Sequence, residues 1–325
     1  MESPKETTPQ GWVIPSDGAS PSSPFRSSVA GCSSGARGYV SRRQFIGAAL
    51  VATAGAMVSR AGGPPRWQIG CYTRPWAQYD YRAAFDGIAA AGFKYVGLMT
   101  TNSKSSLIIS LSTTPEEASA IGAEAKQRGL KVISMWADEF STDNTAGLKH
   151  LIENSAACGC PNLLLGGTEE EHADAYYKIV AECCDYAAAK GVGLSVKPHG
   201  GSNPNGAECR KIIDRIGNKN FRLWYDPGNI FYYSDGKLDP VDDAASVDGV
   251  VAGMSVKDFR APKEVEITPG TGQVNFAKVL SRLQKGGFTH GPLVVECLDH
   301  GDLAHVNAEA VKARRFLEAL TRQKA

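Results

Sequence analysis

Leu-Ser-Val-Lys-Pro-His-Gly-Gly, residues 194–201, is a short apolar strand that ends on a lysine and a histidine. Three later segments have the same form: Leu-Trp-Tyr-Asp-Pro-Gly-Asn (223–229), Met-Ser-Val-Lys-Asp (254–258) and Leu-Val-Val-Glu (293–296). A barrel of parallel strands brings the C-terminal ends of all its strands to one face, where it builds its active site. We therefore expect polar residues that are far apart in the sequence to meet around one ligand.

Strand-like and helical patterns alternate along the whole chain from Trp67 onward. The expected strands are residues 68–72, 95–99, 131–136, 162–165, 193–196, 222–225, 250–256 and 293–296, and the expected helices are residues 81–91, 115–128, 144–157, 173–190, 207–216, 240–246, 276–285 and 304–321. Several helices end at a glycine, as expected for left-handed caps: Gly92, Gly129, Gly191 and Gly287. Right-handed crossovers close such a series into a single (β/α)8 TIM barrel over residues 67–325. An open doubly wound sheet is the alternative, disfavoured because no glycine-rich phosphate motif follows the first strand.

The first 66 residues predict a leader rather than part of the barrel. Residues 1–40 are rich in Ser, Pro and Gly and are expected to be disordered. Ser-Arg-Arg-Gln-Phe-Ile-Gly (41–47) precedes a mild apolar region (48–58), the pattern of a twin-arginine export signal. The apolar region is too short to span a bilayer, so no stable membrane anchor is expected. The interpretation is a protein exported by the twin-arginine machinery to the periplasm or the medium.

Charge and cysteine usage exclude some classes of protein. Without residues 1–66, which hold seven basic and three acidic residues, 28 basic and 31 acidic residues remain. No basic patch stands out, so nucleic acid is not an expected partner. Seven cysteines remain, at spacings unlike those of a zinc site or a disulfide framework. A disulfide between Cys71 and Cys297, on neighbouring first and last strands, stays open.

Five motifs carry a family resemblance. They are Gly-Val-Gly-Leu-Ser-Val-Lys-Pro-His-Gly-Gly (191–201), Trp-Tyr-Asp-Pro-Gly-Asn (224–229), Met-Ser-Val-Lys-Asp (254–258), Pro-Gly-Thr-Gly-Gln-Val-Asn-Phe (269–276) and Leu-Val-Val-Glu (293–296). In this order and spacing they resemble the successive strand ends of the xylose isomerase-like barrels, the sugar phosphate isomerase/epimerase superfamily. The resemblance covers nearly the whole chain after the leader.

The resemblance implies a divalent metal site, but this chain departs from the family's ligand set. The family holds a metal, often manganese, with a glutamate, an aspartate, a histidine and a glutamate at the ends of strands five to eight. The matching positions here are Lys197, Asp226, Ser255 and Glu296. A charged lysine has no acceptor with which to ligate a metal. Two of the four ligands implied by the resemblance are therefore replaced.

Three interpretations of this altered site stay open. In the first, the Lys197 ammonium replaces the metal between Asp226 and Glu296 and stabilises an enediolate. In the second, His199, Asp226 and Glu296 form a rearranged site for manganese, iron or zinc. In the third, catalysis is lost and the pocket only binds a sugar.

Other side chains at the same predicted face are candidates for substrate binding. They are His199, Asn229, Lys257, Asp258, Trp76, Trp136 and Glu139. Aromatic rings stack on the apolar faces of sugars, and polar groups bind the hydroxyls, so these residues form a credible carbohydrate lining. Three of them have simpler readings, since Lys257 and Asp258 could form an ion pair that holds the seventh loop, and His199 could cap a turn.

These residues predict an exported sugar isomerase/epimerase-like enzyme that acts on a carbohydrate. Lys197, Asp226 and Glu296 are the candidate catalytic residues, with Asp226 or Glu296 as the base that removes a proton next to a carbonyl. A Schiff base on the lysine is a variant of the same chemistry. The alternatives are a lyase or hydratase on keto-glycosides and a non-catalytic periplasmic sugar-binding barrel. A nuclease is disfavoured because the chain lacks a basic face.

Overall fold

The computed structural model describes residues 66–322, and the predicted leader with its twin-arginine motif lies outside this range. Within it, eight parallel strands close into a barrel in chain order, as the sequence predicts. The strands are β1 (Trp67–Tyr72), β2 (Tyr95–Leu98), β3 (Lys131–Trp136), β4 (Asn162–Leu165), β5 (Gly193–Val196), β6 (Phe221–Tyr225), β7 (Val251–Val256) and β8 (Gly291–Val295). Pairing of β1 with β8 closes the ring, so the strand edges are covered.

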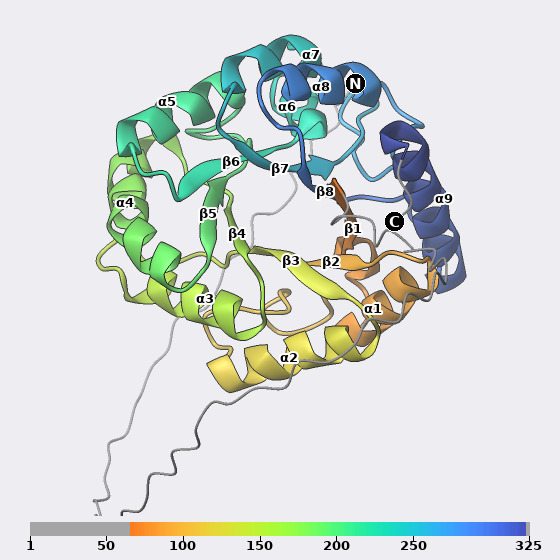
Figure 1. The fold of residues 1–325 in the computed structure, drawn as a ribbon, viewed down its shortest axis with the longest axis horizontal. Coiled ribbons are helices and arrows are strands. Elements are labelled where there is room, and N and C mark those ends of the chain that lie inside the picture. The colour runs from red at the N-terminus through yellow and green to blue at the C-terminus, as the bar shows by residue number, and fades with distance from the viewer. Residues whose placement is uncertain (1–65, 323–325) are drawn as a thin grey trace, which may run out of the picture. The chain divides into compact units, whose positions relative to one another are not determined.

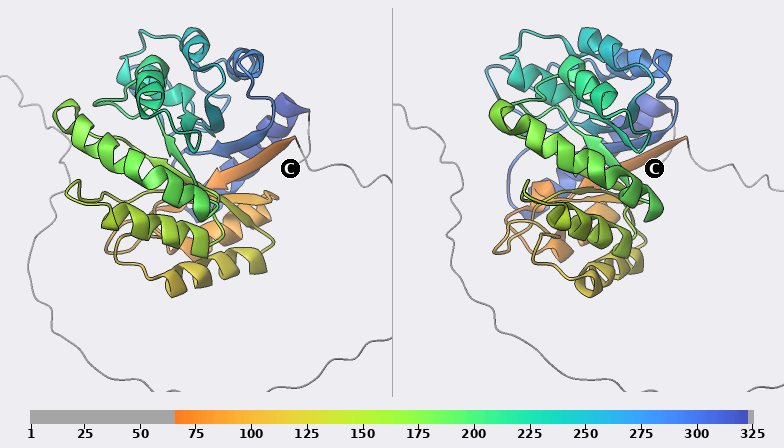
Figure 2. Two further views of the ribbon diagram at one scale, coloured as in Figure 1. Left: turned by 60° about the vertical axis from the view of Figure 1, so that its left-hand side comes forward. Right: turned by 90° about the vertical axis from the view of Figure 1, so that its left-hand side faces the viewer.

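Helices surround the barrel as an outer ring (Figure 1). They are α1 (Tyr81–Ala90), α2 (Pro115–Gln127), α3 (Ala146–Ala157), α4 (Ala173–Ala189), α5 (Gly206–Ile216), α6 (Pro227–Tyr233), α7 (Pro240–Asp243), α8 (Phe276–Lys285) and α9 (Leu303–Thr321), with short 3-10 helices η1 (Arg74–Trp76), η2 (Glu170–His172) and η3 (Ala244–Val247). The side views show α2, α3 and α4 lying against the outside of the strands (Figure 2). The fold is therefore a TIM barrel.

Local sequence explains where several helices begin and end. Thr114 and Glu117 form a reciprocal capping box at the start of α2. Asn205 caps α5, and Gly217 ends it with a φ of 65°. The glycines predicted to follow helices, Gly92, Gly129, Gly191 and Gly287, all have positive φ. These signals lie within one or two turns of the residue that they affect, so they can be found from the sequence.

Two helical segments differ from the expectation. The predicted helix 240–246 is divided into α7 and η3. The segment after Asp226, for which no helix was predicted, forms the helix α6, which has Pro227 at its first position and Asp226 as its N-cap. Proline at the first helical position and aspartate before it are ordinary helix starts. The sequence therefore contained the signal for α6.

The barrel interior is filled by side chains, not open. Tyr72, Met99, Ile133, Leu164, Trp224 and Val294, which lie in or directly after six of the eight strands, form one buried cluster. A larger cluster of apolar residues packs between the outer side of the strands and the helices. The polar strand ends therefore rest on a packed layer.

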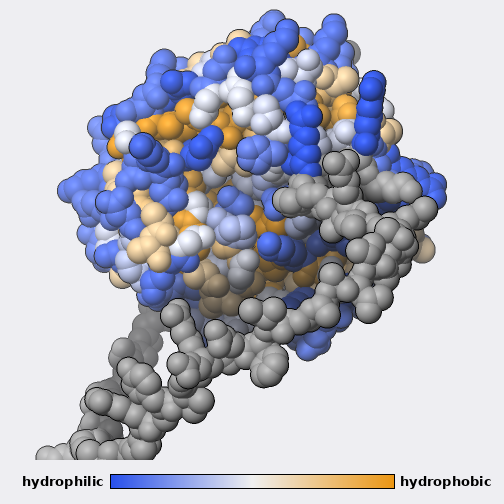
Figure 3. Space-filling model, viewed as in Figure 1, coloured by the Kyte–Doolittle hydropathy of each residue, from blue (hydrophilic) through white to orange (hydrophobic). Residues whose placement is uncertain are grey.

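The remaining surface features are ordinary for a globular barrel. On the face visible in Figure 3, hydrophilic residues predominate and hydrophobic ones form scattered groups. Among residues 66–322, no helix is both long enough and apolar enough to cross a membrane. The seven cysteines in this range are all buried and free, so the disulfide left open between Cys71 and Cys297 is not formed.

Candidate functional site

Four charged residues meet where four neighbouring strands end. Lys197 follows β5, Asp226 follows β6, Lys257 follows β7 and Glu296 follows β8. Backbone hydrogen bonds continue the sheet past the ends of the strands, because Lys197 N donates to Leu165 O and Glu296 N donates to Val256 O. The side chains of these four residues form what we call the lysine–carboxylate cluster.

The charges in the cluster are paired at short distances. Lys197 Nζ lies 2.5 Å from Glu296 Oε2 and 2.8 Å from Asp226 Oδ2. Lys257 Nζ lies 2.7 Å from Glu296 Oε1 and 3.7 Å from Asp226 Oδ2. Two ammonium groups thus bridge two carboxylates, and the four formal charges cancel. Arg74 adds a longer contact, with Nη1 3.3 Å from Glu296 Oε1.

Helix α6 explains the orientation of Asp226. As the N-cap, its Oδ1 accepts a hydrogen bond from Asn229 N at 3.0 Å. The other oxygen, Oδ2, is left facing the lysines. The contact of Oδ2 with Lys197 is close but not aligned as a hydrogen bond, so this buried oxygen has no hydrogen-bond partner in the described part of the chain.

Glu296, by contrast, has both oxygens engaged. Oε2 accepts hydrogen bonds from Lys197 Nζ and from Ser255 Oγ at 2.7 Å, and Oε1 contacts Lys257 and Arg74. Burial alone raises the pKa of Glu296, but Lys197, Lys257 and Arg74 outweigh it and hold the pKa well below its usual range. Glu296 therefore stays ionised, and its lowered pKa makes it a weak proton acceptor.

Lys257 is held in its charged form by the same arrangement. Burial lowers the pKa of Lys257, but Glu296 and then Asp226 outweigh it, so the pKa lies above its ordinary value. Its ammonium also donates to Asn229 Oδ1 at 3.0 Å, and Asn229 Nδ2 donates to Pro198 O at 2.7 Å. Asn229 therefore positions Lys257.

Trp136 and His199 border the cluster on one side. Lys197 Nζ lies 5.4 Å from the centre of the Trp136 ring, within the range of a cation–π contact. The Trp136 and His199 rings are 5.1 Å apart, and the His199 ring is 5.7 Å from that of Tyr233. His199 is an exposed residue, yet the burial of its ring among neighbouring groups, and then the charges of Lys197 and Lys257, lower its pKa to about 3. We therefore expect a neutral imidazole at neutral pH.

Two glycines and an asparagine fix the turn that carries His199. Gly200 and Gly201 have φ values of 81° and 50°, and a Cβ on Gly201 would lie 2.5 Å from Thr168 O. Asn203 Nδ2 donates to Lys197 O at 2.6 Å and to Gly166 O at 2.9 Å. His199 does belong to a turn, and Asn203, which sequence reasoning missed, ties that turn to the loop after β4.

Trp76 and Asp258 do not join the site. The prediction that Trp76 binds substrate is corrected, because its ring is fully buried and its Nε1 donates to Asn307 Oδ1 at 2.9 Å. Asp258 is also fully buried, and its oxygens accept backbone N–H bonds from Phe259, Gly270, Gly272 and Val274. Asp258 holds the seventh loop by these bonds and not by an ion pair with Lys257.

The residues present do not fit the divalent metal that the family resemblance implies. The Lys197 and Lys257 ammonium groups contact the two carboxylates that would be its ligands, and an ammonium can only donate. Asp226 and Glu296 come together, but His199 does not join them as a third donor. In residues 66–322, no group of three or more His, Cys, Asp or Glu side chains is placed to hold a metal ion.

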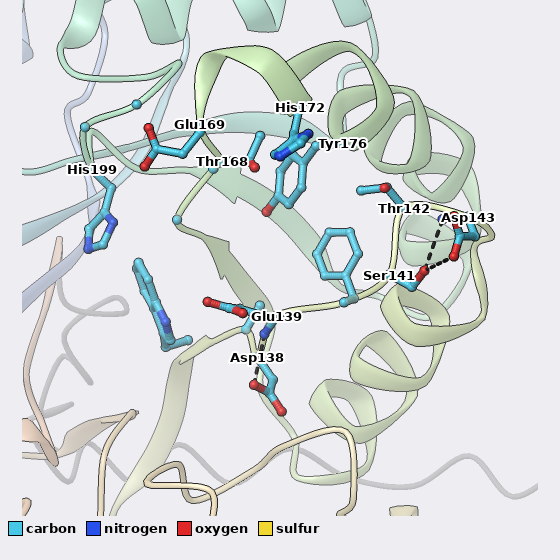
Figure 4. A pocket seen from close by; sticks show the side chains of 17 residues that line it. Asp138, Glu139, Ser141, Thr142, Asp143, Thr168, Glu169, His172, Tyr176 and His199 are labelled. Atoms are coloured by element: carbon cyan, nitrogen blue, oxygen red, sulfur yellow. Dashed lines mark hydrogen bonds between the residues drawn. The ribbon is translucent and has the colours of Figure 1, made fainter. Parts of the chain in front are cut away.

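A cavity lies beside the cluster, between the loops after β3, β4 and β5. This loop cavity has a volume of about 710 Å³, and Trp136, Glu139 and His199 are among its lining residues. It also includes Glu169 and Tyr176, which sequence reasoning missed (Figure 4). The signal was present, since residues 166–169 follow the fourth strand on the same face as the others. None of the four residues of the lysine–carboxylate cluster lines the cavity.

Comparison with known proteins agrees with this architecture. The chain belongs to the family described as the xylose isomerase-like TIM barrel, which it matches over residues 85–320. A search of curated proteins found no match.

Solved structures share the fold at low sequence identity. A xylose isomerase domain protein from Planctomyces limnophilus is 18% identical, with a TM-score of 0.62 over 79% of this chain and 98% of that chain. A D-psicose 3-epimerase solved in the presence of D-fructose is 13% identical, with a TM-score of 0.62 over 78% and 99%. A D-allulose 3-epimerase from Methylomonas sp. in complex with D-allulose is 17% identical, with a TM-score of 0.60 over 79% and 98%.

Proposed function

We propose that the protein is a sugar isomerase/epimerase-like enzyme that removes a proton from a carbon next to a carbonyl. The observation that carries the proposal is the lysine–carboxylate cluster at the ends of β5 to β8, where two ammonium groups bridge Asp226 and Glu296. Membership in the xylose isomerase-like family and the likeness to sugar 3-epimerases support a carbohydrate substrate.

Asp226 is the better candidate for the base. Its Oδ2 has no hydrogen-bond partner among the described residues, whereas both oxygens of Glu296 accept hydrogen bonds from charged donors. In the proposed step, Asp226 Oδ2 takes the proton, the electron pair of the C–H bond forms a carbon–carbon double bond, and the π pair of the carbonyl moves to its oxygen to give an enediolate. A proton delivered by a second donor on the opposite face gives an epimer. Return of the proton from Asp226 to the former carbonyl carbon, with the hydroxyl proton passing to the oxyanion, gives an isomer.

The ammonium groups would supply the positive charge that stabilises the developing oxyanion. A fixed positive charge in a site without water stabilises such an oxyanion without reorganisation. Lys257 suits this role because its raised pKa keeps it protonated. Glu296 then serves to hold both lysines in place.

A non-catalytic sugar-binding barrel is the second candidate, and the burial of the cluster favours it. Lys197, Asp226, Lys257 and Glu296 are each at most 3% exposed, so a sugar reaches them only if side chains that cover the cluster move. A fully paired cluster could also serve only to hold the strand ends together. Binding without proton exchange is the behaviour that this candidate predicts.

Proton exchange in D2O separates the two candidates. We expect the hydrogens next to the carbonyl of D-fructose or D-allulose to be replaced by deuterium, as observed by NMR, and the exchange to survive treatment with EDTA. Asp226→Asn should slow the exchange by about 100-fold or more, the scale of lost general-base catalysis. Asp86→Asn is the matched control, because Asp86 lies on α1, is exposed and pairs with Arg128. Sugar binding with no exchange in any aldose or ketose tested would overturn the enzymatic proposal and favour the binding barrel.

A further inference from the structure

The loop cavity is separate from the lysine–carboxylate cluster but is joined to it by two shared side chains. Trp136 and His199 line the cavity, and the Lys197 ammonium lies 5.4 Å from the centre of the Trp136 ring. His199 feels the charges of Lys197 and Lys257, which help to lower its pKa. Trp136 and His199 therefore lie between the proposed reaction centre and the loop cavity.

The loop cavity is large for a site that holds only one sugar ring. Its volume of about 710 Å³ lies within the range of about 300–1,000 Å³ that is typical of sites for drug-sized ligands. In Figure 4, His199 stands on one side and the segment with Ser141 and Asp143 on the other, with Glu139 and Tyr176 directed into the space between them. The cavity can therefore take a whole second unit of a substrate whose first unit lies at the cluster.

Its walls have the chemistry of a carbohydrate site. The Phe140 and Tyr176 rings stack at 5.0 Å with an interplanar angle of 24°, and the Trp136 and His199 rings form a second aromatic pair. All four residues are in the lining. Flat aromatic rings offer packing surface to the apolar face of a sugar.

The charges in the lining favour a neutral ligand with many hydroxyl groups. The carboxylates of Glu139 and Glu169 have no hydrogen-bond or ion-pair partner among residues 66–322, so they are open to accept from a ligand. Asp138 is different, because it points away and accepts from Leu111 N at 2.9 Å. None of the described residues in the lining is a lysine or arginine, and the acidic lining would repel a phosphate.

We propose that the loop cavity binds the second unit of a neutral disaccharide or larger glycoside, and that such glycosides are preferred as substrates over free monosaccharides and sugar phosphates. The inference rests on the proposed sugar chemistry at the lysine–carboxylate cluster. Trp136 and His199 would lie between the two units, and Glu139 and Glu169 would accept hydrogen bonds from hydroxyls of the second unit.

Calorimetric titration with maltose, cellobiose, lactose, D-glucose, D-galactose and D-glucose 6-phosphate tests the inference. We expect at least one disaccharide to bind about tenfold more tightly than its component monosaccharides, and the phosphate to bind no better than D-glucose. Glu139→Gln, at an exposed position, should lower the ratio of disaccharide to monosaccharide affinity about fivefold, as expected for a lost hydrogen bond to a charged acceptor. Glu116→Gln, on the exposed side of α2, is the matched control and should leave the ratio unchanged.

Equal affinities for disaccharides and monosaccharides, or no disaccharide binding at millimolar concentration, would overturn the inference. A Glu139→Gln variant with an unchanged ratio would do the same. The D2O exchange assay keeps this failure distinct from a failure of the proposed function. Exchange in monosaccharides without disaccharide preference leaves the function standing and removes the glycoside subsite. Glutamate-dependent disaccharide binding without exchange keeps the cavity as a sugar site and removes the enzymatic role.

Discussion

Asp226 and Glu296 lie within reach of the same two lysines, yet their surroundings give them different properties. One oxygen of Asp226 accepts a hydrogen bond from the backbone of α6, and the other has no hydrogen-bond partner in the described chain. Glu296 caps no helix and has both oxygens bound to lysine, serine and arginine groups. A carboxylate can therefore serve as a base at the end of β6 and as an anchor for cations at the end of β8.

Glu296→Gln should lower the free energy of unfolding by about 3–5 kcal/mol, the scale for removing one partner of a buried ion pair. The cause is that Lys197 and Lys257, both buried, lose their shared negative charge. Equilibrium unfolding in urea measures the loss. Glu208→Gln is the control: it breaks an exposed pair with Lys211 and should change the stability by less than about 1 kcal/mol.

The difference in stability between the wild type and Glu296→Gln should also depend on pH. The pKa of Glu296 is lower in the folded than in the unfolded protein, so its stabilising contribution is fully present above the unfolded value, near 4.5. The contribution is lost as the pH falls below that value toward the folded pKa, because protonation then favours the unfolded chain. We expect the stability difference between wild type and Glu296→Gln to be constant from pH 7 to 5 and to shrink below pH 4.5. A difference that stays constant into that acid range would contradict this assignment.

At the scale of the elements, the turn between β5 and α5 controls the site through its close contact with the loop after β4. Ser202 N and Oγ both donate to Thr168 O, at 2.9 Å and 2.8 Å, next to the two glycines that follow His199. Asn203 adds hydrogen bonds from the same turn to Gly166 O and Lys197 O. Both the cluster and the loop cavity thus depend on this one packing contact.

Gly201→Ala tests the contact, with Gly191→Ala as a matched control. Both glycines have positive φ, so each alanine should cost about 1–2 kcal/mol in backbone strain. A Cβ at Gly191 meets nothing within 4 Å, whereas one at Gly201 lies 2.5 Å from Thr168 O. Urea unfolding should therefore show a clearly larger loss for Gly201→Ala. Equal losses would mean that the loop after β4 yields freely and does not hold the turn.

At the scale of the whole molecule, the barrel follows residues that the structure does not describe and that the sequence predicts to be a leader. The twin-arginine motif at residues 41–47 supports the proposal that the protein is exported in its folded form. Seven buried free cysteines fit a protein that folds in a reducing compartment before export.

Substitution of both Arg42 and Arg43 by lysine should keep the full-length protein in the cytoplasm of a bacterial host. The reason is that the export receptor reads the paired arginines as an address. Cell fractionation followed by immunodetection measures the outcome. Arg60→Lys, outside the motif, is the control and should be exported normally. Continued export of the double variant would show that the motif is not the signal.

The sequence by itself determined the eight alternating units, the glycine caps and the meeting of Lys197, Asp226 and Glu296 at one face. These features follow from local periodicity and from the rule that parallel strands end together. Only the tertiary structure decided which way each side chain turns beyond a strand end. In the structure, the side chain of Lys257 lies in the cluster, that of Asp258 binds its own loop and that of Trp76 lies in the core. The structure also forms the loop cavity. Those outcomes depend on packing between segments far apart in the chain, which no short stretch of sequence encodes.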